Sequence, residues 1–336
     1  MARGRTARRL RPRWRLAYLL AAGVTAGLLV ARIEATPASA TRPAATGSPV
    51  RPRLVARTTG RLPVALEGAA VAGALLVGGL VDGTTSTRTV RTLPALGVWG
   101  HLAAGMHDTA ARFAGNALYV LGGGLDSGPS ATIWRVSPHG AVAVGSLPQP
   151  LSDQAGVTLG RVTYIFGGYT GHSVTRSILA FTPPDHVRQV ARLPVGLRYA
   201  AAAALHGRIY LAGGLSSAGL TDEVLRFDPA SGRVTSLDAL PSPLMYATLW
   251  ATAGHLVLLG GRTPTGFTDR TWLVNPATGH LTPLAPLNSA RGYAMLAPLG
   301  AHRALLMGGR SDGRYLDTIL TLKLICVPSS RKGARP

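Results

Sequence analysis

Cysteine is almost absent from this sequence: Cys326 is the only one among 336 residues. A single thiol can form no disulfide within the chain, no CxxC redox pair and no cysteine-ligated zinc site. Because Cys326 follows the apolar run of the last predicted strand, we expect a buried, inert thiol. Disulfide-stapled folds and cysteine-based metal or redox centres are therefore excluded.

Acidic residues are also scarce, with 14 Asp and Glu against 35 Lys and Arg, which gives a net charge of +21. Much of that excess lies at the start of the chain, where residues 1–57 hold twelve Arg and one acid, Glu34. The remaining residues contain no basic helix and no basic stretch interleaved with aromatic residues, so we expect no nucleic-acid partner.

Motifs for catalysis are missing too. The sequence contains no HExxH, no HxH, no GxSxG and no GxGxxG that opens a helix. Asp108 and Asp153 could form a pair of carboxylates for acid–base work, but repeat geometry often brings such a pair together. We therefore predict no catalytic residue, no metal site and no cofactor, and favour binding over catalysis.

The N-terminus has the pattern of an export signal. Seven Arg precede the uncharged stretch 16–31, and the small residues Ala38, Ser39 and Ala40 follow. The stretch is slightly long for a signal peptide and slightly short for a comfortable membrane span. Two alternatives stay open: a single-pass membrane protein with its body outside, or a protein secreted after cleavage near Ala40.

The body of the chain is a sixfold repeat. Apolar strands that end in a glycine pair recur at intervals of 44 to 48 residues, which is the spacing of four-stranded propeller blades. The pairs are Gly78 and Gly79, Gly122 and Gly123, Gly167 and Gly168, Gly213 and Gly214, Gly260 and Gly261, and Gly308 and Gly309. We assign these glycines a structural role, because Gly adopts conformations closed to other residues and lets backbones approach closely.

The fourth repeat shows the expected strand order. We predict an inner strand over 199–205, a second strand over 208–212, a third over 223–227 and an outer strand over 233–237. The sixth repeat lacks an outer strand, whereas residues 54–66 precede the first repeat and resemble an outer strand. The N-terminal segment is therefore predicted to complete the last blade, which removes exposed sheet edges.

These features resemble Kelch repeats. A glycine pair follows an apolar strand, an aromatic residue stands three positions earlier (Tyr119, Tyr164, Tyr210), and a DPxxG-like turn comes later, at 228–232 and 275–279. The resemblance covers roughly 54–325 and is closest to divergent, exported bacterial members. It implies an all-β, six-bladed propeller preceded by an N-terminal hydrophobic helix. The predicted organisation is a signal or anchor (1–34), a Pro-, Ala- and Thr-rich linker (35–52), the propeller (53–326) and a disordered basic tail (327–336).

One ring of residues is a candidate ligand site. Counting back from each glycine pair to the start of the inner strand leads to the mouth of the central channel. The candidate residues there are Asp108, Asp153, Arg198, Tyr199, Tyr246, Arg291 and Tyr293. Tyrosine rings can stack on sugars or hold peptide side chains, while Arg and Asp fix orientation. Bracing of the loops is the alternative role for the same residues.

We expect an extracellular or cell-envelope protein or a glycan as the partner, and a monomer. Two other functions stay open. Because some Kelch propellers act on sugars, a carbohydrate-acting enzyme of the epimerase or lyase type is one; it predicts a deep pocket in which Asp108 or Asp153 lies near an Arg and a Tyr. The other is a purely structural envelope component, which predicts no site.

Overall fold

A computed structural model describes residues 50–328, which form β-strands and no helix. Nearly all of the predicted signal or anchor, linker and basic tail lie outside the described residues, as does the side chain of Cys326. Among the described residues, no helix is long and apolar enough to cross a bilayer.

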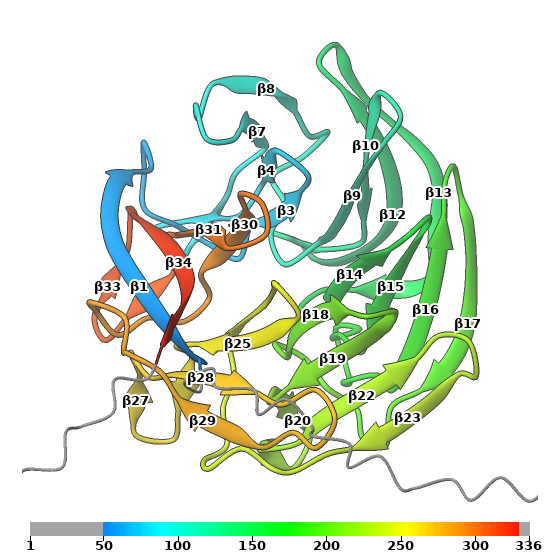
Figure 1. The fold of residues 1–336 in the computed structure, drawn as a ribbon. Coiled ribbons are helices and arrows are strands. Elements are labelled where there is room, and N and C mark those ends of the chain that lie inside the picture. Colours follow the sequence, from blue (N-terminus) through cyan, green and yellow to red (C-terminus); the bar gives the residue numbers. More distant parts are fainter. Residues whose placement is uncertain (1–49, 329–336) are drawn as a thin grey trace, which may run out of the picture. The chain divides into compact units, whose positions relative to one another are not determined.

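Six larger antiparallel sheets carry the fold, and Figure 1 shows them around a common centre. The first sheet contains β3 (Ala70–Ala72), β4 (Leu75–Val77), β7 (Thr89–Thr92) and β8 (Val98–His101). The second contains β9 (Ala110–Ala114), β10 (Ala117–Leu121), β12 (Gly128–Ser137) and β13 (Gly140–Leu151), with β11 (Gly124–Leu125) added to β12. The third contains β14 (Ala155–Leu159), β15 (Val162–Phe166), β16 (Ser177–Thr182) and β17 (His186–Arg192).

The other three larger sheets follow the same order from the inner to the outer strand. The fourth contains β18 (Ala201–Leu205), β19 (Arg208–Ala212), β22 (Val224–Asp228) and β23 (Arg233–Ser236). The fifth contains β24 (Thr248–Thr252), β25 (His255–Leu259), β28 (Thr271–Val274) and β29 (Leu281–Pro283). The sixth contains β30 (Met295–Pro298), β31 (Arg303–Met307), β34 (Thr318–Pro328) and β1 (Val50–Arg61).

The N-terminal strand closes the sixth sheet, as the sequence predicts. β1 runs antiparallel to β34, with Val50 opposite Pro328 and Arg61 opposite Thr318. Leu54 of β1 is 2% exposed and packs with Leu320, Leu322 and Leu324 of β34. Strands from the two ends of the described chain therefore share one sheet and leave no unpaired edge on β34.

The loops next to the glycine pairs form short hairpins, which were not predicted from the sequence. They are β2 (Leu66–Glu67) with β5 (Leu80–Val81) and β6 (Thr85–Ser86), β20 (Leu215–Ser216) with β21 (Gly219–Leu220), β26 (Arg262–Thr263) with β27 (Gly266–Phe267), and β32 (Arg310–Ser311) with β33 (Arg314–Tyr315). Each of these strands has only two residues, too few for a periodicity signal in the sequence.

The apolar core lies between the sheets. Six buried clusters each join residues of two neighbouring sheets, including one that joins the sixth sheet to the first. The last of these contains Leu76 of the first sheet with Met295 and Met307 of the sixth. A closed circuit of contacts follows, which is the arrangement of a β-propeller.

The glycine pairs join the sheets through their backbones. The second glycine of every pair donates a hydrogen bond of 2.7–2.8 Å to a carbonyl that precedes the next inner strand. In chain order, the acceptors are Met106, Leu151, Leu197, Leu244, Arg291 and Leu66. The first glycine has a left-handed φ of 56–64° in each pair. A Cβ on Gly167 would lie 2.0 Å from the Leu197 carbonyl oxygen, so only glycine fits there.

Candidate functional site at the channel mouth

Six residues with left-handed backbones form a ring where the inner strands begin. They are Gly68, Asp108, Asp153, Tyr199, Tyr246 and Tyr293, with φ between 49 and 61°. Each stands two positions before an inner strand, so the inner strand of the fourth sheet begins at Ala201 rather than at the predicted Tyr199. A left-handed backbone costs a residue with a Cβ about 1–2 kcal/mol. The surrounding contacts hold five such residues in this conformation.

Hydrogen bonds between backbones connect this ring around the channel. Asp108 donates to Gly68 (2.8 Å), Tyr199 to Asp153 (3.0 Å), Tyr246 to Tyr199 (3.2 Å), Tyr293 to Tyr246 (2.8 Å), and Gly68 to Tyr293 (3.5 Å). Each bond joins residues of consecutive sheets, and the five bonds link all neighbouring ring residues except Asp108 and Asp153, which fixes where the side chains emerge. The mouth is thus built on the rigid part of the fold.

Three tyrosines form an aromatic cluster on one side of the mouth. The ring centroids of Tyr246 lie 4.5 Å from Tyr199 and 4.2 Å from Tyr293, and Tyr199 and Tyr293 meet edge to face at 5.8 Å. All three side chains are half-buried, so each ring keeps part of its surface toward the channel. Burial raises the pKa of Tyr246 to about 12 and raises the pKa of Tyr293 well above its ordinary value, which favours the protonated phenols.

Two carboxyl groups face the tyrosines. The phenol of Tyr293 donates a short hydrogen bond to Asp108 Oδ2, and the carboxyl of Asp153 lies within hydrogen-bonding range of Asp108. Burial raises the pKa of Asp108 well above its ordinary value, and the charges of Asp153 and Glu67 raise it further, whereas the Tyr293 bond opposes the shift. The pair therefore holds on to a proton that a solvent-exposed pair would release.

Arg198 connects the carboxyl pair to the outer edge of the mouth. Its Nη1 lies 3.2 Å from Asp153 Oδ2, and the side chain of Asp153 is only 7% exposed. The guanidinium also lies over two tyrosine rings, 4.9 Å from the centroid of Tyr169 and 5.0 Å from that of Tyr199. Arg198 therefore contacts the carboxylate of Asp153 and two aromatic faces at once.

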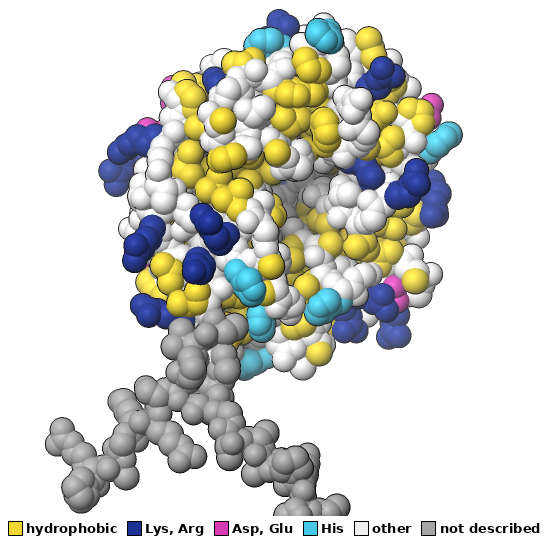
Figure 2. Space-filling view, turned by 45° about the horizontal axis from the view of Figure 1, so that its top comes forward, with side chains coloured by type: hydrophobic (Ala, Val, Ile, Leu, Met, Phe, Trp, Pro, Cys, Tyr) yellow, Lys and Arg dark blue, Asp and Glu magenta, His cyan; other side chains and the backbone are white. Residues whose placement is uncertain are grey.

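These residues surround a cavity of about 150 Å³. Its wall also includes Thr109, Gln154 and the alanines that follow the three tyrosines. The Oε1 atom of Gln154 is buried and has no hydrogen-bond partner among the described residues. Below it, a channel of about 480 Å³ runs along inner strands lined mainly by Ala, Val and Leu side chains. Figure 2 shows a hollow at the centre of the molecule, which the sheets surround.

The structure brings together six of the seven residues expected at the mouth. Asp108, Asp153, Tyr199, Tyr246 and Tyr293 line the cavity, and Arg198 reaches it through Asp153.

Arg291 is the exception, because it occupies the position that holds a buried Leu or Met in the other sheets. It is 2% exposed and donates to Ser289 Oγ (2.9 Å) and Thr318 Oγ1 (3.1 Å), away from the cavity. Burial lowers its pKa to about 10. Arg291 lies two positions before the ring residue Tyr293, whereas Arg198 lies one position before Tyr199, so the two arginines are not equivalent.

An ion pair next to the mouth was not predicted as such. Glu67 has no exposed surface and accepts hydrogen bonds from Arg310 through both carboxylate oxygens, with Arg310 Nε 3.0 Å from Oε2. Arg310 also lies over the ring of Tyr315, with a distance of 5.0 Å to its centroid. Only the positions of these two residues in the repeat could have indicated the pair: Glu67 directly precedes the ring residue Gly68, and Arg310 directly follows a glycine pair.

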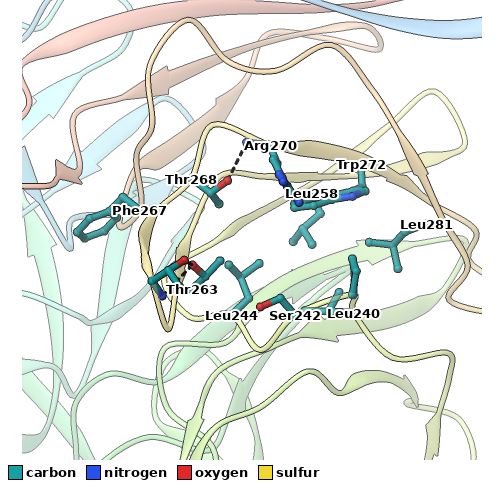
Figure 3. A pocket seen from close by; sticks show the side chains of 12 residues that line it. Leu240, Ser242, Leu244, Leu258, Thr263, Phe267, Thr268, Arg270, Trp272 and Leu281 are labelled. Carbon is teal, nitrogen blue, oxygen red and sulfur yellow. Dashed lines mark hydrogen bonds between the residues drawn. The ribbon is translucent and has the colours of Figure 1, made fainter.

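A second cavity of about 270 Å³ lies between the fourth and fifth sheets (Figure 3). Leucines line its floor, with Trp272 and Phe267 at its sides, and Arg270 and three threonines supply polar groups. It shares no residue with the mouth. This cavity therefore provides a separate location against which a function of the mouth can be tested.

Comparisons with known proteins identify the fold. No protein-family model and no curated protein sequence matches this chain. Solved structures do match, among them one described as the structure of YjhT, with a TM-score of 0.67 and 15% sequence identity. The match covers 80% of this chain and 98% of that chain. At this identity the likeness shows a β-propeller-like fold alone.

Proposed function

We propose that this protein is an exported or membrane-tethered propeller of six Kelch-like blades that binds a glycan at its channel mouth. The six larger sheets, each joined to the next at a glycine pair, support the blade assignment. The basic, then apolar N-terminal sequence supports export. A glycan fits the chemistry of the mouth better than a protein segment does.

The observation that carries this function is the convergence of aromatic faces and hydrogen-bonding groups on one small cavity. About 150 Å³ is room for roughly five waters at about 30 Å³ each, so a single terminal sugar or one side chain can enter. Burial favours the protonated form of Asp108, in which the carboxyl can donate as well as accept, and the oxygens of Asp153 are hydrogen-bond acceptors. Such a mixture complements sugar hydroxyl groups, and the half-exposed tyrosines supply a face for the sugar ring.

A carbohydrate-acting enzyme is the second candidate, and one specific observation favours it. The two carboxyls have different environments: Asp108 is held protonated by burial, and Asp153 is paired with Arg198. Such a difference is how enzymes assign an acid and a base. Carboxyls that share a hydrogen bond are closer than the roughly 5–10 Å that glycosidases place between theirs, so an epimerase or lyase fits better than a hydrolase.

The test is a glycan array probed with the full-length chain in detergent. The comparison variants are Tyr199→Ala/Tyr246→Ala/Tyr293→Ala at the mouth and Trp272→Ala at the second cavity. Loss of binding by the triple variant alone, with its thermal unfolding transition kept, supports the mouth. Loss by Trp272→Ala alone assigns binding to the second cavity, and equal binding by all three proteins overturns a mouth site.

Catalysis is then tested on any sugar that binds. Nuclear magnetic resonance of the sugar, incubated with the intact chain and with Asp153→Asn, separates the two candidates. If the intact chain converts the sugar and Asp153→Asn does not, the protein is an enzyme. An unchanged sugar in both samples leaves it a binding module.

A further inference from the structure

The described chain begins and ends at the side of the propeller opposite to the mouth. Leu324 of β34 donates a hydrogen bond of 3.0 Å to the carbonyl of His302, which lies in the turn at the far end of the sixth inner strand. β1 pairs with this part of β34, so Val50 and Pro328 lie together beyond His302. Figure 1 shows the two strand ends side by side. Any anchor before Val50 therefore joins the propeller on this side.

The turns at the far ends of the inner strands form a rim around the channel, which we call the basal rim (73–74, 115–116, 160–161, 206–207, 253–254 and 299–302). Arg112 donates to the carbonyl of Gly160 at 3.4 Å, and Thr252 donates to the carbonyl of Ala301 at 2.6 Å, so neighbouring turns touch. Most inner strands have five residues, so about 17 Å separates this rim from the mouth.

The basal rim is basic, whereas the acidic residues along the channel lie at its mouth, where arginines pair with two of them. The turns and the residues that flank them carry Arg112, Arg161, Arg208, Arg303, His206 and His302, and their sequence contains no Asp or Glu. The opposite end of the channel carries Glu67, Asp108 and Asp153. Arg51 and Arg53, on the strand by which the chain enters, are exposed and add positive charge at the same side.

Part of this charge is unneutralised. Arg112 has its pKa lowered by burial and by the neighbouring Arg161; its Nε and Nη1 atoms are buried and have no hydrogen-bond partner among the described residues, whereas Arg161 is exposed. Arg208, by contrast, is paired with Asp228 at 3.2 Å. Two arginines side by side without a carboxylate between them suit an anion such as a phosphate group.

Apolar side chains are exposed beside these charges. Phe113 and Leu299 lie at two of the rim turns and are 42% and 38% exposed. Trp99 meets the ring of Phe113 edge to face at 6.2 Å. Aromatic and aliphatic side chains next to arginines are the composition of surfaces that lie at the boundary of headgroups and acyl chains.

We propose that the basal rim docks on the anionic phospholipid headgroups of the membrane that holds the N-terminal segment, so that the mouth points away from the bilayer. This inference rests on the membrane-tethered form of the proposed function. The apolar stretch ends at Ala31, and the eighteen residues 32–49 reach at most about 60 Å, which lets the rim reach the bilayer without holding it there. Each arginine near an anionic surface strengthens association by roughly fivefold.

The test measures how close each side of the propeller lies to the lipid. The full-length chain carries Cys326→Ser and a donor dye at Asn116→Cys on the rim or at Ala218→Cys in a loop on the mouth side. It is placed in nanodiscs that contain an acceptor-labelled lipid. With 30% phosphatidylglycerol we expect energy transfer from position 116 to be at least twice that from position 218. In pure phosphatidylcholine the difference should vanish.

Matched variants make the result specific. Arg112→Gln/Arg161→Gln/Arg303→Gln should remove the difference, whereas Arg314→Gln, on the mouth side, should keep it. Equal transfer from both positions in anionic discs, or a difference that the triple variant retains, overturns the docking. A chain that does not co-purify with nanodiscs at all shows instead that the tether is absent, and glycan binding is measured separately.

Discussion

Tyr293 donates a hydrogen bond to Asp108 across 185 positions of sequence, from the sixth sheet to the second. The two residues are equivalent members of the mouth ring, two repeats apart, with Gly68 of the first sheet between them. Gly68 is the ring residue between them, and because it has no side chain the Tyr293 phenol can reach Asp108. A Cβ on Gly68 would lie 2.7 Å from Asp108 Oδ1. A small residue in one repeat thus permits a polar contact between two others.

The raised pKa of Asp108 predicts a stability that depends on pH. Because the native carboxyl holds its proton more tightly than the unfolded one, this stabilisation is complete below the ordinary pKa near 4 and is lost as the pH rises toward the native value. Asp108→Asn should remove this pH dependence, so the variant should become more stable relative to the natural protein as the pH increases. Urea unfolding at pH 4, 6 and 8, followed by the fluorescence of the buried Trp250, measures it.

Asp185→Asn, at an exposed turn, is the matched control and should follow the natural protein at every pH. If the stability of Asp108→Asn instead runs parallel to that of the natural protein from pH 4 to pH 8, the native carboxyl has the same pKa as the unfolded one and the protonated pair is wrong.

The Glu67–Arg310 pair predicts an asymmetric response to substitution. Arg310→Gln leaves a fully buried carboxylate without its partner and should cost about 3–5 kcal/mol. Glu67→Gln leaves a guanidinium that is 37% exposed, which water can solvate, and should cost about 1–2 kcal/mol. Chemical unfolding of both single variants and the double variant measures the coupling. Equal costs for the two single variants would contradict a charged, buried Glu67.

The glycine pairs show what the sequence could reveal. Their spacing predicted the repeat and the sheet order, because a tight backbone contact accepts only one residue type and so recurs visibly. The closing N-terminal strand was predicted because the sixth repeat lacks an outer strand and residues 54–66 resemble one. The mouth ring was found by counting from the same glycines. Side-chain direction was less accessible: Arg291 lies two residues from Tyr293 yet points into the core, since its position continues the buried leucines of the other sheets. Neither contacts between distant repeats, such as Glu67 with Arg310, nor the two-residue hairpins leave a periodic pattern.

Two glycines with the same backbone conformation should differ in their tolerance of alanine. Gly160 and Gly167 both have a φ of 59°, but a Cβ on Gly160 meets nothing within 4 Å, whereas one on Gly167 meets the Leu197 carbonyl oxygen at 2.0 Å. Gly160→Ala should cost about 1 kcal/mol, from the left-handed backbone alone. Gly167→Ala should cost more than about 3 kcal/mol, because two sheets must separate. Similar unfolding midpoints for the two variants would argue against the backbone contact between sheets.

Because β1 completes the sixth sheet, we expect the stability of the propeller to depend on residues of this N-terminal strand, which precede the first repeat. Leu54 is 2% exposed, and its side chain packs against the core between the fifth and sixth sheets. Leu54→Ala should cost about 2–5 kcal/mol, the usual range for a large-to-small change in a core. Val55→Ala, a change on the opposite face of the same strand, should cost less, since Val55 is half-buried. Equal and small effects on thermal unfolding would mean that β1 is dispensable, so the ring would close through the contacts of the sixth sheet with the first alone.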